Sequence, residues 1–178
     1  MTGGDAHEGG APQVVALPAP DPRDPVARLE RQALVAVLQH PDVVDSATFD
    51  ALEDDAFVVP AWRAVHDAVR AAGGIRESQG MQPGRWVEAV CEAASEAVLP
   101  VVNELSVAPM PEDRPGAVEG YVRDVIRKLV DLGLTRRVAD ARSRLQRTDP
   151  AADADAYGAA FAELLAIEKE RRELRESA

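Results

Sequence analysis

The sequence predicts an all-α protein: an N-terminal helical bundle followed by a long helix and a C-terminal antiparallel helical hairpin. First, apolar residues recur at intervals of three and four along most of the chain, which is typical of amphipathic helices. Second, no segment alternates steadily between apolar and polar residues, and the most strand-like run, FVVPAW, is interrupted by Pro60. Third, hydrophobic residues make up 46% of the 178 residues and are mostly Ala, Val and Leu, of which Ala and Leu favour helices.

The chain is long enough for one domain or two small ones. Residues 1–24 are rich in Gly, Pro, Ala and Asp and have one short apolar patch, so they cannot bury enough surface to offset their ordering entropy. We therefore expect a flexible linker over residues 1–24, a bundle over 25–116, and the long helix with the hairpin over 117–178.

The first helix is expected to begin at Asp24-Pro25, since Asp is a good N-cap and Pro is favoured at the first helical position. It should end near Gln39, because Pro41 disfavours helical geometry at the preceding residue. Its middle, residues 33–38, is apolar in every direction, which predicts a helix buried on all sides.

The remaining bundle helices have their own start and stop signals. A short helix is expected over 47–53, capped by Asp45 or Ser46, and a longer one from Pro60 that ends at Gly73-Gly74. Residues 75–82 are expected to be a loop, followed by short helices that begin at Pro83 and Pro100 and an acidic, Pro-rich connector over 108–116. The helix from Pro83 should bury the stripe Val87, Val90, Cys91 and Ala94.

No proline occurs from residue 118 to 147, which predicts one long helix or a kinked pair. The apolar residues before and after Gly133 are out of step by two positions, about 200° on a helix of 3.6 residues per turn. The two halves should therefore bury opposite faces. The two series are Val118, Val122, Val125, Leu129 and Leu132, then Leu134, Val138, Ala141 and Leu145.

The last helix, from about 153 to 176, is the remaining partner for the second half of the long helix. Its apolar residues are Tyr157, Ala160, Leu164, Ile167 and Leu174, with Phe161 and Leu165 alongside. The turn RTDPAAD joins the two helices. Two helices alone make a thin core, so the hairpin is either marginally stable or docks on a partner.

The net charge of −11 argues against nucleic-acid binding by this chain, since that needs a basic face for the phosphates. The single cysteine, Cys91, excludes an internal disulfide and a Cys-rich metal site. No apolar run is long enough to span a bilayer, and the N-terminus lacks the features of a signal peptide. The sequence predicts a cytoplasmic protein without membrane contact.

No constellation for catalysis, cofactor or metal binding is evident. The histidines at 7, 40 and 66 lack companion ligands, and Gly73-Gly74 follows a helix, whereas a phosphate loop precedes one. Asp153-Ala154-Asp155 resembles a metal-binding acidic pair, but it stands at a helix start, where acidic residues favour the helix dipole. We expect helix capping there, with no catalytic, cofactor or metal site.

The order of features resembles the C-terminal helicase-binding domain of the bacterial replicative (DnaG-type) primase. These features are the buried helix ending in QHPD, the Phe49/Phe57 patch, the Trp62-Arg63 helix, the long helix led by Tyr121 and the closing helix ELLAIEKERRELRE. The resemblance covers residues 25–176. It implies a bundle plus hairpin that binds the replicative DNA helicase and recruits primase to the replication fork for primer synthesis.

The residues expected to meet the helicase lie on the last helix, where apolar side chains not used in the hairpin core would form an exposed strip with arginines beside it. They are Tyr157, Phe161, Leu164, Leu165, Ile167, Arg171, Arg172 and Leu174, with Arg175 beside them. The alternative for each apolar member is an ordinary place in the hairpin core. For the arginines it is a solvated face paired with Glu168, Glu173 and Glu176, worth only ~0.3–0.5 kcal/mol per pair.

Some members of that family also bind the acidic tail of single-stranded-DNA-binding protein on the bundle, which needs a basic pocket. The candidates here are Arg28, Arg31, Arg63 and Arg70. The zinc-binding and catalytic parts of the family's enzyme have no counterpart in this sequence, so we expect an isolated interaction domain and not an enzyme. The alternatives are the N-terminal domain of the replicative helicase itself and a small all-α enzyme or regulatory protein.

Overall fold

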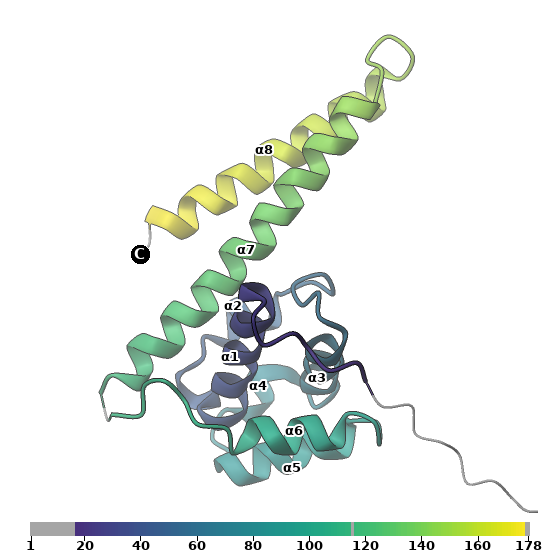
Figure 1. Ribbon diagram of the computed structural model, residues 1–178. Helices are drawn as coiled ribbons and strands as arrows, with labels where there is room; N and C mark the ends of the chain where they lie inside the picture. The colour runs from purple at the N-terminus through teal and green to yellow at the C-terminus, as the bar shows by residue number, and fades with distance from the viewer. Residues whose placement is uncertain (1–16, 115, 177–178) are drawn as a thin grey trace, which may run out of the picture.

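The computed structural model describes residues 17–114 and 116–176, and every regular element in these ranges is a helix (Figure 1). The predicted all-α class is therefore confirmed. Most of the predicted linker, residues 1–16, lies outside the described residues. Within the described ranges, no helix combines the length and the apolarity needed to cross a membrane. The elements are α1 (Pro25–Gln39), η1 (Pro41–Val43), α2 (Ser46–Asp50), α3 (Pro60–Ala71), α4 (Gly74–Ser78), α5 (Pro83–Ala93), α6 (Leu99–Ser106), α7 (Val118–Arg147) and α8 (Ala154–Glu176).

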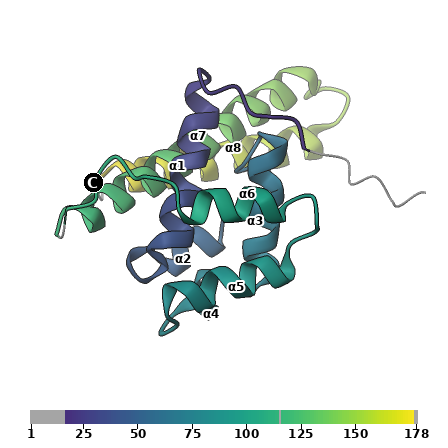
Figure 2. The same cartoon turned by 60° about the horizontal axis from the view of Figure 1, so that its bottom comes forward.

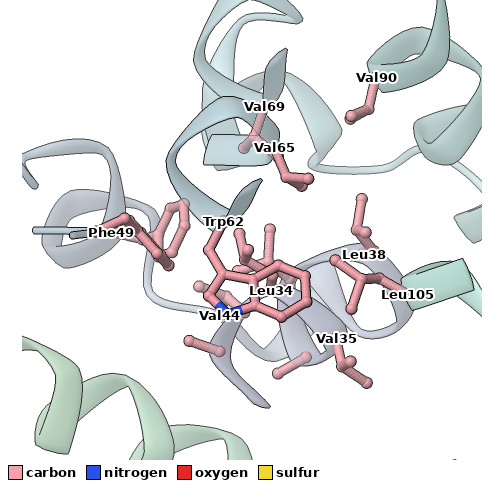
Figure 3. Close-up of a cluster of buried hydrophobic side chains, with 14 of the residues drawn as sticks. Leu34, Val35, Leu38, Val44, Phe49, Trp62, Val65, Val69, Val90 and Leu105 are labelled. Carbon is pink, nitrogen blue, oxygen red and sulfur yellow. The ribbon is translucent and has the colours of Figure 1, made fainter. Parts of the chain in front are cut away.

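Helix α1 is the centre of the bundle, as its apolar middle predicts. The Asp24 carboxylate accepts a hydrogen bond from the Val26 N–H at 2.9 Å and so caps the helix. Residues 33–38 are all buried, because α3, α5, α6 and α7 pack around them (Figures 2 and 3). This one helix therefore organises the bundle core, to which α2 and its following loop add Phe49 and Phe57.

A short helix, α4, occupies part of the segment that the sequence predicts to be a loop. Gly73 has φ 101°, the left-handed conformation that ends α3, and α4 begins at the next residue. The Asp50 carboxylate from α2 accepts hydrogen bonds from the N–H groups of Ile75 at 2.7 Å and Arg76 at 3.0 Å. The predicted loop over 75–82 was wrong in its first part because the group that caps α4, the Asp50 carboxylate, is distant in the sequence. The short helix expected over 47–53 is also shorter, with Asp45 as its cap.

The buried face of α5 is centred on Trp86 and Val90, so Val90 is the one member of the predicted stripe that is fully buried. Trp86 is fully buried, and its indole N–H donates to the Val37 carbonyl at 3.1 Å. Val87 and Cys91 are only half-buried, and Ala94 lies just past the end of the helix. The stripe was partly wrong because it left out the aromatic residue, whose large apolar area dominates the packing.

Helix α7 is continuous, and its buried face changes as predicted around Gly133. Before that residue, Val122, Val125, Ile126 and Leu129 belong to the bundle core. After it, Leu134, Val138 and Ala141 form a second core with Leu164 and Ile167 of α8. Helix α8 returns along the second half of α7, so the two form an arm that extends beyond the bundle (Figure 1).

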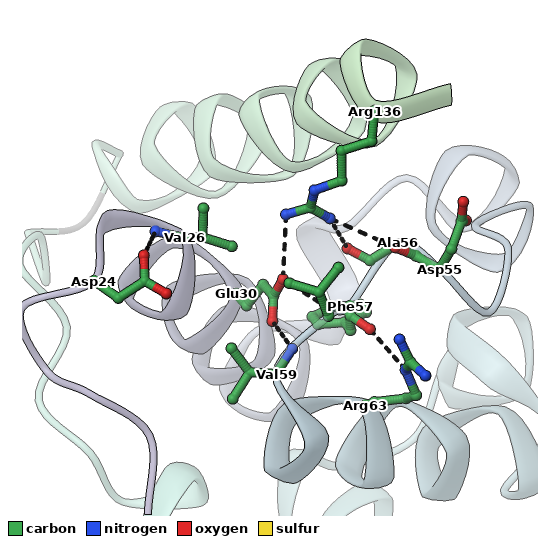
Figure 4. A network of polar contacts seen from close by, with 10 residues as sticks. Asp24, Val26, Glu30, Asp55, Ala56, Phe57, Val59, Arg63 and Arg136 are labelled. Atoms are coloured by element: carbon green, nitrogen blue, oxygen red, sulfur yellow. Dashed lines mark hydrogen bonds and ion pairs between the residues drawn. The ribbon is translucent and has the colours of Figure 1, made fainter. Parts of the chain in front are cut away.

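The bundle and the hairpin half of α7 meet at a buried carboxylate, that of Glu30 (Figure 4). Its two oxygens accept hydrogen bonds from the N–H groups of Val58 at 2.9 Å and Val59 at 3.1 Å. These groups lie at the N-terminus of α3, where a negative charge is favourable. Arg136 of α7 is ion-paired with Glu30 and also donates to the Ala56 carbonyl at 3.3 Å. A polar network therefore joins the two apolar cores.

Candidate protein-interaction site

The apolar hairpin residues predicted to meet the helicase range from buried to exposed. Leu164 and Ile167 face α7 and are 9% and 2% exposed, so the ordinary core position holds for both. Phe161 and Leu165 face away and are 47% and 51% exposed. Tyr157 and Leu174 lie between these extremes as half-buried residues. The structure therefore places on the surface only part of the predicted apolar set.

Phe161 and Leu165 lie one helical turn apart on the side of α8 that faces away from α7. Exposed residues at helical spacing continue this side in both directions. We call it the outer face of α8, and it comprises Gly158, Phe161, Ala162, Leu165, Lys169 and Arg172. The outer face is apolar toward the hairpin turn and carries charges of both signs toward the C-terminal end, where the exposed Glu173 and Glu176 continue it.

Arg171 and Arg175 point inward and do not belong to this face. Arg171 Nε lies 3.3 Å from Asp131 Oδ1, and Arg175 Nη2 lies 3.2 Å from the same oxygen. Partial burial acts to raise the pKa of Asp131, but hydrogen bonds from Arg175 and Arg171 outweigh it and lower the pKa. The two arginines thus fasten the end of α8 to α7, which leaves Arg172 as the outward arginine of the predicted set.

Further ion pairs cross between α7 and α8 along the hairpin. Arg142 contacts Glu168, and Arg144 contacts Glu163, each at 2.6 Å. Arg137 lies between Glu53 of the bundle and Glu170 of α8, at 3.5 and 3.7 Å. These exposed pairs are individually weak, but together they fix which side of α8 faces its neighbour.

A groove of about 590 Å³ lies where α1, the middle of α7 and the end of α8 meet. Its floor is apolar, with Val26, Leu29, Leu132 and Leu174. Its charged lining is Arg127, Lys128, Arg175 and Asp131. This groove was not predicted from the sequence, in which its one signal is the adjacent pair of cations at 127 and 128 on a helix that packs against α1.

The four arginines predicted for an acidic tail do not line this groove and do not converge. Arg31 is ion-paired with Glu104 at 3.1 Å, and Arg70 is ion-paired with Asp54. Arg63 donates to the Phe57 carbonyl at 2.8 Å, whereas Arg28 is exposed on α1. Two lie on α1 and two on α3.

His66 and Asp153, which were considered from the sequence as possible ligands, have structural roles. His66 is fully buried against Phe49 and Phe57, and burial lowers its pKa to about 4, so the ring is neutral at neutral pH. Asp153 accepts a hydrogen bond from the Ala156 N–H at 2.9 Å, as expected of a helix cap. In the described part of the chain, no cluster of three His, Cys, Asp or Glu side chains is placed to hold a metal ion.

Comparison with known proteins identifies relatives of this arrangement. Residues 30–160 match the family described as DNA primase DnaG DnaB-binding. The DNA primase of Mycolicibacterium smegmatis is 38% identical over 160 residues, which are 89% of this chain and 25% of that protein. The DNA primase of Mycobacterium leprae is 35% identical over 170 residues, 95% of this chain and 26% of that protein. The chain thus spans about a quarter of the length of these relatives.

A solved structure has the same fold. The helicase binding domain of primase from Mycobacterium tuberculosis superposes with a TM-score of 0.66 at 33% identity, covering 84% of this chain and 91% of that one. These matches favour the primase assignment over a helicase N-terminal domain or an unrelated all-α regulator. The chain therefore belongs to the DnaB-binding family of the DNA primase DnaG.

Proposed function

We propose that this chain is a non-catalytic interaction domain that binds the replicative DNA helicase and so recruits primase to the replication fork in the cytoplasm. Its family and the solved relative, a helicase binding domain of primase, support this partner. The domain needs no cofactor in this role. Its contribution is affinity, and the chemistry of primer synthesis belongs to other parts of a primase.

The exposed pair Phe161 and Leu165 carries the proposal. Large hydrophobic residues that are exposed in the described ranges are few, and these two share one side of one helix. They lie on an arm that extends beyond the bundle, where a large partner can reach them (Figure 1). Aromatic and arginine side chains dominate many binding interfaces, so Phe161 and Arg172 are the expected anchors.

Recruitment works through effective concentration. Once the hairpin is docked, a primase active site attached by a flexible segment stays near the unwound template, and its effective concentration can reach the millimolar range for a short tether. Of the predicted linker, residues 1–24, the part up to residue 16 lies outside the described residues, and Leu17 packs against the bundle core. The predicted division into a linker, a bundle over 25–116 and a hairpin unit over 117–178 belongs to this proposal.

Co-elution of this chain with the replicative helicase from the same organism tests the proposal. The wild-type chain should co-elute, whereas Phe161→Asp and Leu165→Asp should elute separately with unchanged helical content. Val107→Asp is the matched control, because Val107 is 82% exposed on the bundle side of the chain. Separate elution of the wild-type chain, or equal loss with all three variants, contradicts the proposal.

The groove between α1, α7 and α8 supports a second function, capture of the acidic C-terminal tail of single-stranded-DNA-binding protein. Three cations, of which Arg175 is paired with Asp131 of the same lining, and apolar residues between them fit a ligand that carries carboxylates. Binding of that tail peptide, followed by fluorescence anisotropy, should weaken with Lys128→Glu. It should not change with Arg85→Glu, a charge reversal on the exposed side of α5. If Arg28→Glu or Arg63→Glu weakens binding instead, the arginines predicted from sequence are the site.

A further inference from the structure

A second groove, of about 430 Å³, lies between the bundle and the hairpin. It is lined by α2 and the loop that follows it, by the middle of α7 and by the end of α8. Leu174 of α8 lines this groove as well as the cationic groove described above, so the end of α8 separates the two. The larger apolar residues of the second groove are Leu52, Val130, Leu134 and Leu174.

The charged residues of the second groove are mainly carboxylates, so we call it the acidic groove. Its carboxylates are Glu53 and Asp55 from the loop after α2, and Glu170 and Glu173 from α8. The one cation that the described residues contribute to this lining is Arg137 of α7. Lys169, which lies outside the groove, contacts Glu173 at 3.6 Å. The lining therefore carries an excess of negative charge on both of its walls.

Arg137 shows the kind of group that the two walls accept. Its guanidinium lies between Glu53 of the bundle and Glu170 of α8, at 3.5 Å and 3.7 Å. These distances are longer than those of direct hydrogen bonds, and both carboxylates are more than half exposed. The two pairs are therefore weak, and each carboxylate can accept hydrogen bonds from a second cation.

Gly133 of α7 leaves space in the apolar part of the acidic groove. It lies between Val130 and Leu134 along the lining, and a Cβ at this position would meet nothing within 4 Å. Gly133 is not among the described glycines with positive φ, so its backbone does not require glycine. A side chain of another molecule can therefore approach α7 here without displacing any residue of this chain.

The charge of the groove narrows the class of ligand. A nucleic acid is excluded, because its phosphates need cations. A second copy of this chain would bring a net charge of −11 to a groove that is already negative. In the described ranges, no three His, Cys, Asp or Glu side chains are placed to hold a metal ion. A basic segment of another protein satisfies both the carboxylates and the apolar lining.

We infer that the acidic groove docks a segment of another protein that carries Lys or Arg residues around a large apolar side chain. The cations contact Glu53 and Asp55 on one wall and carboxylates of α8 on the other. The apolar side chain enters the space beside Gly133. The groove contains neither Phe161 nor Leu165, so this second docking site is independent of the proposed function.

A defined peptide tests the inference on the full chain. The probe is a fluorescein-labelled helical peptide of Arg and Leu, and its binding is followed by fluorescence anisotropy at physiological salt. Gly133→Leu should weaken binding at least about tenfold, because it fills the space without changing any charge. Glu53→Gln should weaken binding roughly two- to fivefold, as expected for the loss of an exposed ion pair.

Two matched variants control for general effects of bulk and of charge. Gly120→Leu adds the same bulk at another open, exposed position of α7, outside the groove. Glu92→Gln removes the same charge on the exposed side of α5. Both variants should bind the peptide as wild type does. Circular dichroism should show unchanged helical content in all four variants.

Two further peptides separate docking in the groove from general attraction between opposite charges. The peptide with Ala in place of Leu keeps the charge and should bind at least about tenfold more weakly. The peptide with Glu in place of Arg should not bind. Equal affinity of the Leu and Ala peptides overturns the inference. Absence of wild-type binding, or binding that Gly133→Leu and Glu53→Gln leave unchanged, overturns it as well, whatever the result with the helicase.

Discussion

Arg136 of α7 lies with its Nη2 3.5 Å from Oε1 of Glu30, a carboxylate that is completely buried in α1 (Figure 4). The pair links the hairpin half of α7 to the helix at the centre of the bundle. The two apolar cores are otherwise separate clusters that share Val130 as a neighbour. The angle at which the arm leaves the bundle therefore depends on α7 itself, on this polar junction and on the pair between Arg137 and Glu53.

Removing the arginine should destabilise the protein. We expect Arg136→Met to lower the free energy of unfolding by about 2 kcal/mol, less than the ~3–5 kcal/mol typical of a broken buried pair. The loss is smaller because Glu30 keeps its two N–H donors and Arg136 is 24% exposed. Urea denaturation measures the change. Arg142→Met, which removes an exposed pair, should cost less than ~1 kcal/mol. Equal losses in the two variants contradict a special role for Glu30.

The stability of the bundle should fall on mild acidification because of His66. The pKa of His66 is about 4 in the folded protein and 6.5 in the unfolded chain. Between these two pH values the unfolded chain therefore binds more protons than the folded protein. Stability is therefore complete above pH 6.5 and declines as the pH falls toward 4, by at most about 1.4 kcal/mol per pH unit. Urea denaturation between pH 7 and 4.5 measures the slope. The dependence of the unfolding free energy on pH should become weaker in His66→Leu. An unchanged slope in that variant would mean that other titrating groups cause the dependence.

Two glycines should respond oppositely to alanine. Gly158→Ala should raise the free energy of unfolding by about 0.5–1 kcal/mol, since the position is helical and open. Gly74→Ala should lower it by more than ~1 kcal/mol, because Gly74 has φ +73° and a Cβ there would lie 2.6 Å from Asp50 Oδ1. Thermal unfolding of both variants checks this. A stable Gly74→Ala protein contradicts the tight junction between α2 and α4.

Substitutions at buried and exposed positions of α8 should have different effects on stability. Ile167→Ala should destabilise the hairpin by about 2–4 kcal/mol, because Ile167 is 2% exposed within a small core. Leu165→Ala, at a 51% exposed position, should change stability by less than about 0.5 kcal/mol. Hydrogen exchange of the α8 amides reports the difference. Comparable exchange rates in the two variants contradict the observed orientation of α8.

The elements predicted most accurately are those specified by local signals. Asp24-Pro25 and Pro41 bound α1, and the phase shift at Gly133 is visible in the spacing of the apolar residues. What the sequence did not reveal depends on contacts distant along the chain. Examples are the capping of α4 by Asp50 and the hydrogen bonds that Glu30 accepts from the N–H groups of Val58 and Val59, just before α3.

The candidate site was predicted in outline only. Periodicity identified α8 as amphipathic, but its apolar residues cover more than one side, so spacing alone could not separate the core residues Leu164 and Ile167 from the exposed Phe161 and Leu165. The inward turn of Arg171 depends on Asp131, which is 40 residues away. The groove between α1, α7 and α8 forms only where these three helices meet, so no single segment of the sequence predicts it.

An NMR titration of the isotopically labelled chain with the helicase's N-terminal domain tests the central claim most directly. We predict that amide shifts concentrate on the outer face of α8, at Gly158, Phe161, Leu165 and Arg172, while the bundle surface around Val107 stays unchanged. Shifts confined to the bundle, with the outer face unaffected, would contradict recruitment through the hairpin.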